Sequence, residues 1–280
     1  MVFLPDDALL VIFEFLLDSV SDNVDGWHTL IHVCQQWRNV VLSSPRRLNL
    51  RLLCTGGRSV REMLDIWPTL PIVIRDCGDI MLLDKEADNI IAALEHPGRV
   101  GEIRLIDIPG SLLEIFAVAM KESFPVLTAL ELRLDHEGPR PVLPDSFFGG
   151  SVPCLRVLDL TGLPFSAVRN LLLSTSELVY LCLWDMPISL NTSSPKDIAT
   201  CLSAMTKLES IELGFCSSFH PYRTSRHALP SPIARIVLPA LTHFWFQGDG
   251  RYLEGLMVHL DTPLLDGVTI IKPYGPSPIA

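Results

Sequence analysis

The chain is poor in charged residues, and basic residues are the scarcer kind. Of 280 residues 19% are charged, and 22 Lys and Arg stand against 32 Asp and Glu, which gives a formal net charge of −10. An acidic chain repels phosphate backbones, so nucleic acid is excluded as the expected main ligand. The hydrophobic fraction of 48% supplies a continuous buried core, which excludes disorder over most of the length.

Long apolar runs and paired cysteines are also missing. No apolar run reaches membrane-spanning length, and the first one, Ala8 to Phe13, is cut by Glu14 and lacks a basic leader or a cleavage site. The cysteines at 34, 54, 77, 154, 182, 201 and 216 form no C-x-x-C pair. This odd, widely spaced set suits reduced thiols better than a disulfide framework. We therefore expect an intracellular protein of the cytoplasm or nucleus, with no membrane partner.

Recognisable catalytic and metal-binding motifs are absent from the sequence. There is no Walker loop, no G-x-S-x-G elbow and no H-E-x-x-H, and Gly56-Gly57 and Gly149-Gly150 lack the flanks of a phosphate loop. His32 and Cys34, taken as part of one helix, would point about 200° apart and could not share a metal from one face. We expect no enzyme activity, no metal and no other cofactor.

An apolar triplet in the spacing apolar-x-x-apolar-x-apolar recurs along the chain. Turn or strand-entry residues precede each triplet at one fixed offset, and successive triplets begin two to three dozen residues apart. Such regularity indicates a repeated structural unit. The triplets are Val100/Ile103/Leu105, Leu127/Leu130/Leu132, Leu155/Leu158/Leu160, Leu178/Leu181/Leu183, Leu208/Ile211/Leu213, Leu241/Phe244/Phe246 and Leu265/Val268/Ile270.

Helix-start signals lie between the triplets, and similar signals precede the first one. A Ser or Asp before an apolar-periodic stretch can cap the first turn of a helix, and Glu or Asp three residues later completes a capping box. The expected caps are Ser59 with Glu62, Ser111 with Glu114, Ser166, Ser194 with Asp197, and Asp249.

Strand, helix and strand joined by short links imply parallel strands and right-handed crossovers. Repetition of this unit predicts an α/β fold, a curved right-handed α/β solenoid with a parallel sheet on its concave face. The units resemble leucine-rich repeats of irregular length, and we assign residues 44–280 to this repeat domain. An ordinary open α/β sheet is the alternative.

The period-two pleat of a strand predicts which side chains would meet a partner. The residue between the last two members of each triplet points away from the core, and neighbouring aromatic residues flank it. Acidic residues beside exposed aromatics are typical of a protein-binding face, although the tryptophans could instead pack under a loop or terminal cap. The expected substrate-binding residues are Arg104, Glu131, Asp159, Tyr180, Trp184, Glu212, His243 and Trp245, with Cys182 and Thr269 in the same row.

Residues 1–43 form a separate helical module with two helical stretches and a polar break between them. Leu9, Ile12, Phe13 and Leu16 fall on one face of the first stretch, and the polar loop runs from Asp18 to Gly26. The second stretch is expected to place Trp27, Leu30, Cys34, Trp37 and Val41 on one face. So short a module buries little on its own and has to pack on the repeats or on a partner.

The stretches "LPDDALLVIF" and "WHTLIHVCQQWRNVV" together resemble an F-box. An F-box followed by leucine-rich repeats resembles the F-box families of mushroom-forming (basidiomycete) fungi. The resemblance implies a short N-terminal all-α F-box-like module that docks on a Skp-type adaptor. By position, the adaptor-binding residues would be Leu4, Pro5, Ile12, Phe13, Val33, Cys34 and Trp37.

The resemblance further implies a non-catalytic substrate-recognition subunit of a cullin–RING (SCF-type) ubiquitin ligase, whose repeats bind a protein substrate marked for degradation. The alternative is a leucine-rich-repeat scaffold or inhibitor whose F-box-like helices only cap the solenoid, with no role in ubiquitin ligation.

Overall fold

The computed structural model describes residues 4–18, 26–54, 59–67, 69–75, 84–135, 138–144, 146–186, 194–215 and 235–271. The first helices in these ranges are α1 (Asp6–Asp18), α2 (Gly26–Ile31) and α3 (Gln35–Ser43). Further helices of the described residues follow between strands: α4 (Val60–Ile66), α5 (Asp84–Leu94), α6 (Gly110–Ala119), α7 (Phe165–Leu173), α8 (Pro195–Leu202) and α9 (Gly250–Met257), with a short 3-10 helix, η1 (Phe147–Gly150).

The strands alternate with these helices along the chain. They are β1 (Leu52–Leu53), β2 (Ile72–Arg75), β3 (Val100–Ile108), β4 (Ala129–Leu134), β5 (Val157–Thr161), β6 (Tyr180–Met186), β7 (Ser210–Phe215), β8 (Ile236–Val237), β9 (His243–Gln247), β10 (Leu260–Asp261) and β11 (Gly267–Ile271). Within the described residues, nine of them form one parallel sheet in the order β1-β2-β3-β4-β5-β6-β7-β9-β11, and β8 pairs separately with β10.

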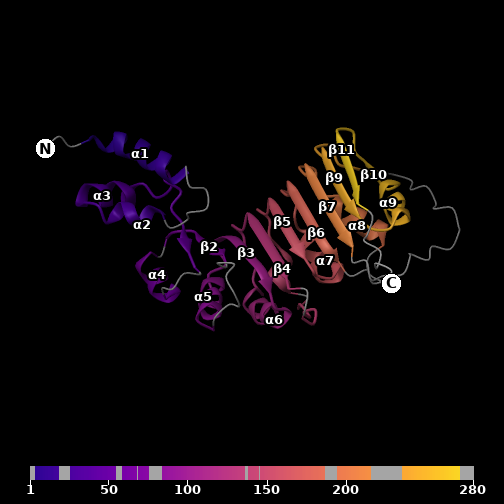
Figure 1. Ribbon diagram of the computed structural model, residues 1–280, viewed down its shortest axis with the longest axis horizontal. Coiled ribbons are helices and arrows are strands. Elements are labelled where there is room, and N and C mark those ends of the chain that lie inside the picture. The colour runs from indigo at the N-terminus through magenta and orange to yellow at the C-terminus, as the bar shows by residue number, and fades with distance from the viewer. Residues whose placement is uncertain are drawn as a thin grey trace, which may run out of the picture.

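Strands that are neighbours in this sheet follow one another along the chain, and helices α4 to α9 lie along one face of it (Figure 1). The other face carries no helix in the part of the chain that the structure describes, and we call it the open face. The predicted α/β class with a parallel sheet is therefore confirmed, and the strand order is compatible with an α/β solenoid.

The apolar triplets supply the core between the sheet and the helices. Ile103, Leu130, Leu158, Leu181 and Ile211 pair in one register across β3 to β7, and all are buried. The pattern changes at the end of the sheet, where Val268 and Ile270 are about half exposed. Among the described residues strand β11 has a sheet neighbour on one side alone, so its core-facing side chains are less covered.

The second N-terminal stretch is two helices rather than one, which corrects the expected apolar face. Residues 32 and 33 form a turn between α2 and α3, and Cys34 adopts an extended conformation (φ −158°, ψ 172°) as the N-cap of α3. Cys34 is exposed and does not share a helical face with Trp37. The helical angle used above to separate His32 from Cys34 therefore does not apply to this pair.

The N-terminal helices pack directly on the start of the sheet. The Trp27 indole N–H donates a hydrogen bond to the Arg51 carbonyl (2.9 Å), and the Trp27 ring contacts Trp67 edge-on at 5.4 Å. Arg47 and Glu14 form an ion pair at 2.5 Å. One cluster of buried side chains extends from Leu9 to Leu260. The helical module and the strand–helix units thus share a continuous core.

Two of the predicted helix caps are confirmed. Ser194 and Asp197 form a complete capping box at the start of α8, with Pro195 in the first turn. The Asp249 side chain accepts a hydrogen bond from the Arg251 backbone N–H (2.7 Å) at the start of α9. Both caps satisfy backbone donors that a helix cannot satisfy internally.

Of the other three predictions, Ser111 and Ser166 are wrong because prolines precede those helix starts, whereas Ser59 is the N-cap of α4 as predicted but forms no capping box. Helix α6 begins after the extended Pro109 and α7 after the extended Pro164, so Ser111 and Ser166 lie inside the helices. Glu114 accepts a hydrogen bond from the Val142 backbone N–H instead (2.7 Å). Ser59 stands at the N-cap of α4 without a side-chain bond, and Asn89 accepts from Val60 N–H (3.1 Å).

Candidate protein-binding surface

The predicted row of outward side chains lies on the open face of the sheet, one residue from each strand. Backbone pairing places its members side by side from β3 to β11: Arg104, Glu131, Asp159, Cys182, Glu212, Trp245 and Thr269. Tyr180 and His243 stand two residues before row members, and Trp184 two residues after one, so the pleat directs them to the same face. Their role in binding stays a prediction, but the sequence located them on one surface.

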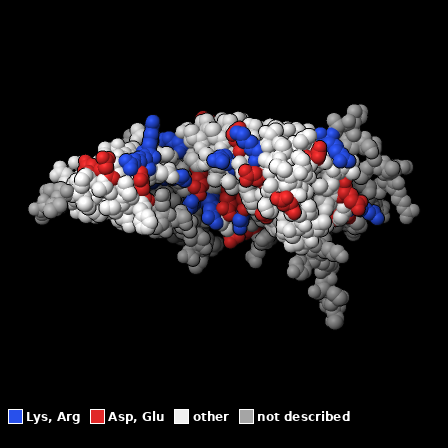
Figure 2. All heavy atoms as spheres, turned by 90° about the horizontal axis from the view of Figure 1, so that it is seen from above, with Lys and Arg blue, Asp and Glu red and all other residues white. Residues whose placement is uncertain are grey.

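The N-terminal half of this face is a network of alternating charges, which we call the charged ladder. Glu102 accepts from Arg75 (2.7 Å) and pairs with Arg51 (3.4 Å). Glu131 pairs with Arg104 (2.8 Å), and Arg133 reaches Asp159 (2.7 Å). Figure 2 shows basic and acidic side chains interspersed over this part of the molecule. The members of the charged ladder are Arg51, Arg75, Glu102, Arg104, Glu131, Arg133 and Asp159.

Sequence reasoning missed Arg51, Arg75, Glu102 and Arg133. A signal was present for two of them, because Glu102 and Arg133 stand two residues from Arg104 and Glu131 and therefore share their face. Arg51 directly precedes β1 and Arg75 is the last residue of β2, and both strands come before the regular triplets.

The charged ladder does not satisfy all of its own polar atoms. Glu131 Oε1, Arg133 Nε and Asp159 Oδ1 are buried without a hydrogen-bond partner among the described residues. Glu131 Oε1 lies 2.9 Å from Arg133 Nη2, but the contact lacks hydrogen-bond geometry. The hydrogen bond to Asp159 raises the pKa of Arg133. Buried polar atoms without partners are costly, so this surface keeps unused capacity for hydrogen bonds.

The C-terminal half of the open face is aromatic. The Trp184 and Trp245 rings contact each other at a centroid distance of 4.4 Å and an angle of 42°, and each side chain is partly buried. Strand β7 lies between their strands. It permits the contact because Gly214 has no side chain there: a Cβ on Gly214 would stand 2.3 Å from Trp184 Cε3. Sequence reasoning placed both tryptophans on this face but did not foresee the role of Gly214.

Tyr180, Cys182 and Glu212 complete the aromatic half. The Tyr180 hydroxyl donates a hydrogen bond to Glu212 Oε1 (2.9 Å). Burial, followed by the Asp159 and Glu212 carboxylates, raises the pKa of the Cys182 thiol. Burial, the Cys182 sulfur and the Glu212 hydrogen bond raise the pKa of Tyr180. Thiol and phenol therefore stay neutral near pH 7, and Asp159 and Glu212 supply the negative charge.

His243 lies at the edge of this region. Its side chain is exposed, and its Nδ1 lies 2.8 Å from the Thr242 hydroxyl. Backbone pairing places it in the row of Tyr180 and Ser210, next to the row of Glu212.

The N-terminal module presents a second surface, which is apolar. Of the predicted adaptor-binding residues, Leu4 is 49%, Ile12 40% and Val33 57% exposed, and Pro5 and Cys34 are also exposed. Gln36 Nε2 donates to the Leu4 carbonyl (2.9 Å) and to Asp6 (3.0 Å), which fixes the start of α1 against α3. The structure thus brings Leu4 and Pro5 close to the helix that follows Val33 and Cys34.

Phe13 and Trp37 are more buried than the other predicted adaptor-binding residues. Phe13 is fully buried and contacts the partly buried Trp37 ring edge-on at 4.8 Å. These two side chains support the surface from within. Sequence reasoning missed Val11 and Phe15, which are exposed with Ile12 and Leu16 along one stripe of α1. We call the stripe Val11, Ile12, Phe15 and Leu16 the α1 stripe.

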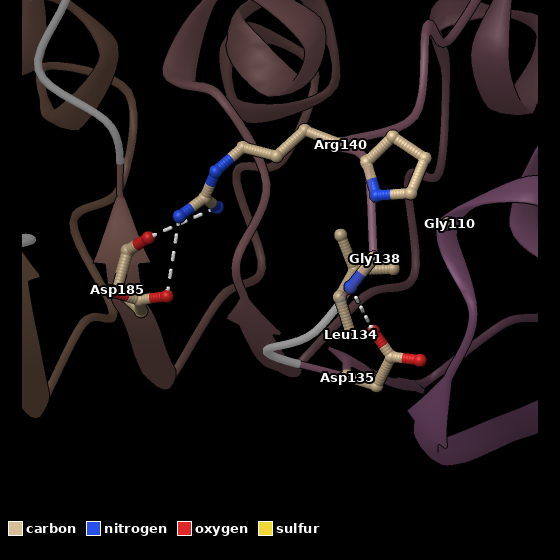
Figure 3. A pocket seen from close by; sticks show the side chains of 7 residues that line it. Gly110, Leu134, Asp135, Gly138, Arg140 and Asp185 are labelled. Atoms are coloured by element: carbon tan, nitrogen blue, oxygen red, sulfur yellow. Dashed lines mark hydrogen bonds and ion pairs between the residues drawn. The ribbon is translucent and has the colours of Figure 1, made fainter.

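The described residues also line two hollows. Arg140 closes the first, a cavity of about 40 Å³, by reaching the Asp185 carboxylate at 3.3 Å, while Asp135 accepts from Gly138 N–H at 3.0 Å (Figure 3). Arg140 also donates to the Gly162 carbonyl. These contacts tie residues 138–140 to the end of β6. The second is a groove of about 520 Å³ between α2 and α4, lined by His28, His32, Glu62, Met63 and Trp67 among others.

Neither hollow gathers a metal site. Across the described ranges no group of three or more His, Cys, Asp or Glu residues could hold a metal ion. Searched over the same residues, no helix is long and apolar enough to cross a bilayer. His220 and His227 lie outside the described residues.

Comparison with known proteins gives no relative: no protein-family model matches the chain, and no curated protein matches it significantly. The two surfaces described above therefore carry the functional interpretation.

Proposed function

We propose that this chain is the non-catalytic substrate-recognition subunit of an SCF-type cullin–RING ubiquitin ligase. The observation that carries the proposal is the α1 stripe, a row of exposed apolar side chains on a short helical module. These side chains are exposed although other apolar residues of the same module are buried in the continuous core. Contiguous exposed apolar side chains on a soluble module mark an interaction site. Their sequence is the stretch that resembles an F-box.

In this proposal the F-box-like module docks on a Skp-type adaptor. Leu4, Ile12 and Val33 would make direct contact with it, together with Pro5 and Cys34, because all of them are exposed. Phe13 and Trp37 would hold the helices in the docking geometry. Complete burial of a Leu, Ile or Phe side chain contributes roughly 1.5–3 kcal/mol, so a few such side chains supply a stable contact.

The strand–helix units then act as irregular leucine-rich repeats that hold the substrate. Their open face offers arginines and two tryptophans, residue types that are enriched in protein–protein interfaces, and carboxylates that can complement basic side chains of a partner. The chain itself would perform no chemistry and need no cofactor. It would promote ubiquitin transfer inside the cell by holding a protein substrate near the conjugating enzyme, which raises the effective concentration of the reacting groups.

A leucine-rich-repeat scaffold or inhibitor is the second candidate. The contact that favours it is the hydrogen bond from Trp27 to the Arg51 carbonyl, through which the helical module covers the first strand of the sheet. In this alternative the module is a cap for the repeats, the open face still binds a protein, and no adaptor is recruited.

An adaptor pull-down separates the two candidates. The wild-type chain should retain a purified Skp-type adaptor, and Ile12→Ser with Phe15→Ser should lose it, because both side chains are exposed on the α1 stripe. The matched control is Ile115→Ser on α6, which is 53% exposed on a helix remote from α1. That control should bind like the wild type.

Two results would count against the proposal in different ways. Failure of the folded wild-type chain to retain the adaptor would leave the scaffold candidate. Equal retention by the α1 double variant would mean that the adaptor docks elsewhere on the chain.

A further inference from the structure

Glu212 differs from the other acidic residues of the open face. Glu102, Glu131 and Asp159 each pair with at least one arginine of the charged ladder. Glu212 accepts a hydrogen bond from the Tyr180 hydroxyl at 2.9 Å, and none of the ion pairs found in the described ranges involves it. A partly buried carboxylate that pairs with no cation among the described residues is a site for a cation from a partner.

Aromatic rings surround this carboxylate. Trp245 is the partner of Glu212 in the backbone register of β7 and β9, and the Trp184 ring crosses β7 over Gly214 to contact Trp245. Tyr180 lies on the other side, held by its hydrogen bond. The faces of indole rings attract cations, and tryptophan does so most strongly. Carboxylate and rings together therefore suit a planar cation that can stack and donate at once.

Asp159 supplies a second, independent sign of a missing donor. Its side chain is buried, Oδ2 is held by Arg133, and Oδ1 lacks a partner among the described residues. Cys182 stands between Asp159 and Glu212 in the row. The two carboxylates therefore stand one strand away from Cys182 on either side, and both raise the pKa of its thiol.

We propose that Tyr180, Trp184, Glu212 and Trp245 form a subsite for one arginine side chain of the protein bound on the open face. The inference rests on the proposed protein-binding function of that face. A guanidinium stacks on an aromatic ring and gives a carboxylate two parallel hydrogen bonds, whereas an ammonium does neither as well. The subsite would therefore prefer Arg to Lys and reject acidic segments.

Random octapeptides displayed on phage and selected on the full chain test this subsite. The wild type should enrich peptides with an arginine at one fixed position, and Glu212→Gln should lose that enrichment. Gln keeps an oxygen that can accept from Tyr180, so the fold should persist. Glu254→Gln, an exposed acid on α9, is the matched control and should select the same peptides as the wild type.

Affinities of one selected peptide then locate the contact. Replacing its arginine by citrulline, which keeps the shape but not the charge, should weaken binding to the wild type roughly tenfold or more. The same replacement should have little further effect on Glu212→Gln, because the two changes remove one interaction. Additive effects, equal affinity for a lysine peptide, or enrichment of acidic peptides would overturn the subsite.

The adaptor pull-down distinguishes failure of the subsite from failure of the ligase role. Adaptor binding without any arginine-containing enrichment overturns the subsite and leaves the ligase proposal standing. Arginine enrichment that depends on Glu212, in a chain that does not bind the adaptor, supports the subsite and refutes the ligase role.

Discussion

At the scale of single residues, Gly214 decides the shape of the aromatic half of the open face. Its backbone is ordinary strand, so the requirement is close approach rather than an unusual φ. The Trp184 ring occupies the space in which a side chain at this position would stand. One absent side chain thus allows two tryptophans on strands separated by β7 to meet.

Gly214→Ala should therefore displace the Trp184 ring and cost about 1–3 kcal/mol of unfolding free energy, as over-packing does. Urea unfolding measures the cost, and circular dichroism measures the exciton signal of the paired indoles, which should shrink. Gly98→Ala is the control, since a Cβ there meets nothing within 4 Å. Equal stability and equal spectra for the two variants would contradict this role of Gly214.

Cys201 on α8 predicts how stability responds to alkali. Burial raises the pKa of its thiol from 9.0 to about 11. The unfolded chain therefore loses this proton first, so the stabilisation is complete below about pH 9 and is lost as the pH rises toward 11. The free energy of unfolding, measured by urea denaturation, should fall more steeply with pH over this window for the wild type than for Cys201→Ala. Parallel curves would refute the prediction.

At the scale of elements, α1 has two apolar faces with different tasks. Leu9 and Phe13 belong to the core, while the α1 stripe is exposed. The sequence predicted one face with Leu9, Ile12, Phe13 and Leu16 together. Hydrophobic residues on nearly all sides of a short helix leave its orientation open, and tertiary packing selected the side that carries Phe13.

Two phenylalanines on α1 separate these tasks. Phe13→Ala should cost about 3–5 kcal/mol of unfolding free energy, because the side chain is 0% exposed and leaves a cavity. Phe15→Ala should stay within about 0.5 kcal/mol, because Phe15 is 74% exposed. Chemical unfolding of both variants compares the same substitution two residues apart. Similar costs would contradict the assignment of the faces.

The sheet was the most predictable element, because its triplets repeat often enough to fix which residues face inward. The break between α2 and α3 was not predictable, because it depends on Arg38 Nε donating to the Ile31 carbonyl (3.0 Å) at the end of α2. The irregularities at the ends of β3 and β6 also lacked a sequence signal. Asp107 and Asp185 adopt a positive φ at these points. A glycine in the sequence would have indicated such a backbone conformation more clearly.

The sequence predicted the row of residues on the open face, but not its division into the charged ladder and an aromatic half. The pleat placed Arg104, Glu131, Asp159, Glu212 and Trp245 on one face. Which acidic residues of the face pair with arginines depends on individual contacts: Arg133 reaches Glu131 and Asp159, and Arg51 and Arg75, from other strands, pair with Glu102. The contact of Trp184 with Trp245 depends on Gly214, from a third strand. Pairwise contacts of this kind cannot be derived from periodicity.

At the scale of the whole molecule, the core is continuous but each strand touches its neighbours alone. In such an arrangement a local defect spreads to adjacent units and fades beyond them. The link between the N-terminal helices and the sheet is the place to test this, because Trp27 contacts both Arg51 and Trp67.

Trp27→Phe removes the indole N–H and should cost about 1–3 kcal/mol, since the Arg51 carbonyl loses its donor. Native-state hydrogen exchange should become faster in α1 to α3 and in β1 and β2, and stay unchanged in β7 and β9. Equal acceleration along the entire chain would show that the molecule opens as one unit instead.

The central claim is that the α1 stripe recruits an adaptor while the open face remains available for a substrate. Titration calorimetry of the full chain with a Skp-type adaptor tests it most directly. We predict 1:1 binding with a negative heat-capacity change from apolar burial, unchanged in Glu212→Gln and lost in Ile12→Ser with Phe15→Ser. Absence of binding by the folded wild type, or equal weakening by both variants, would contradict the claim.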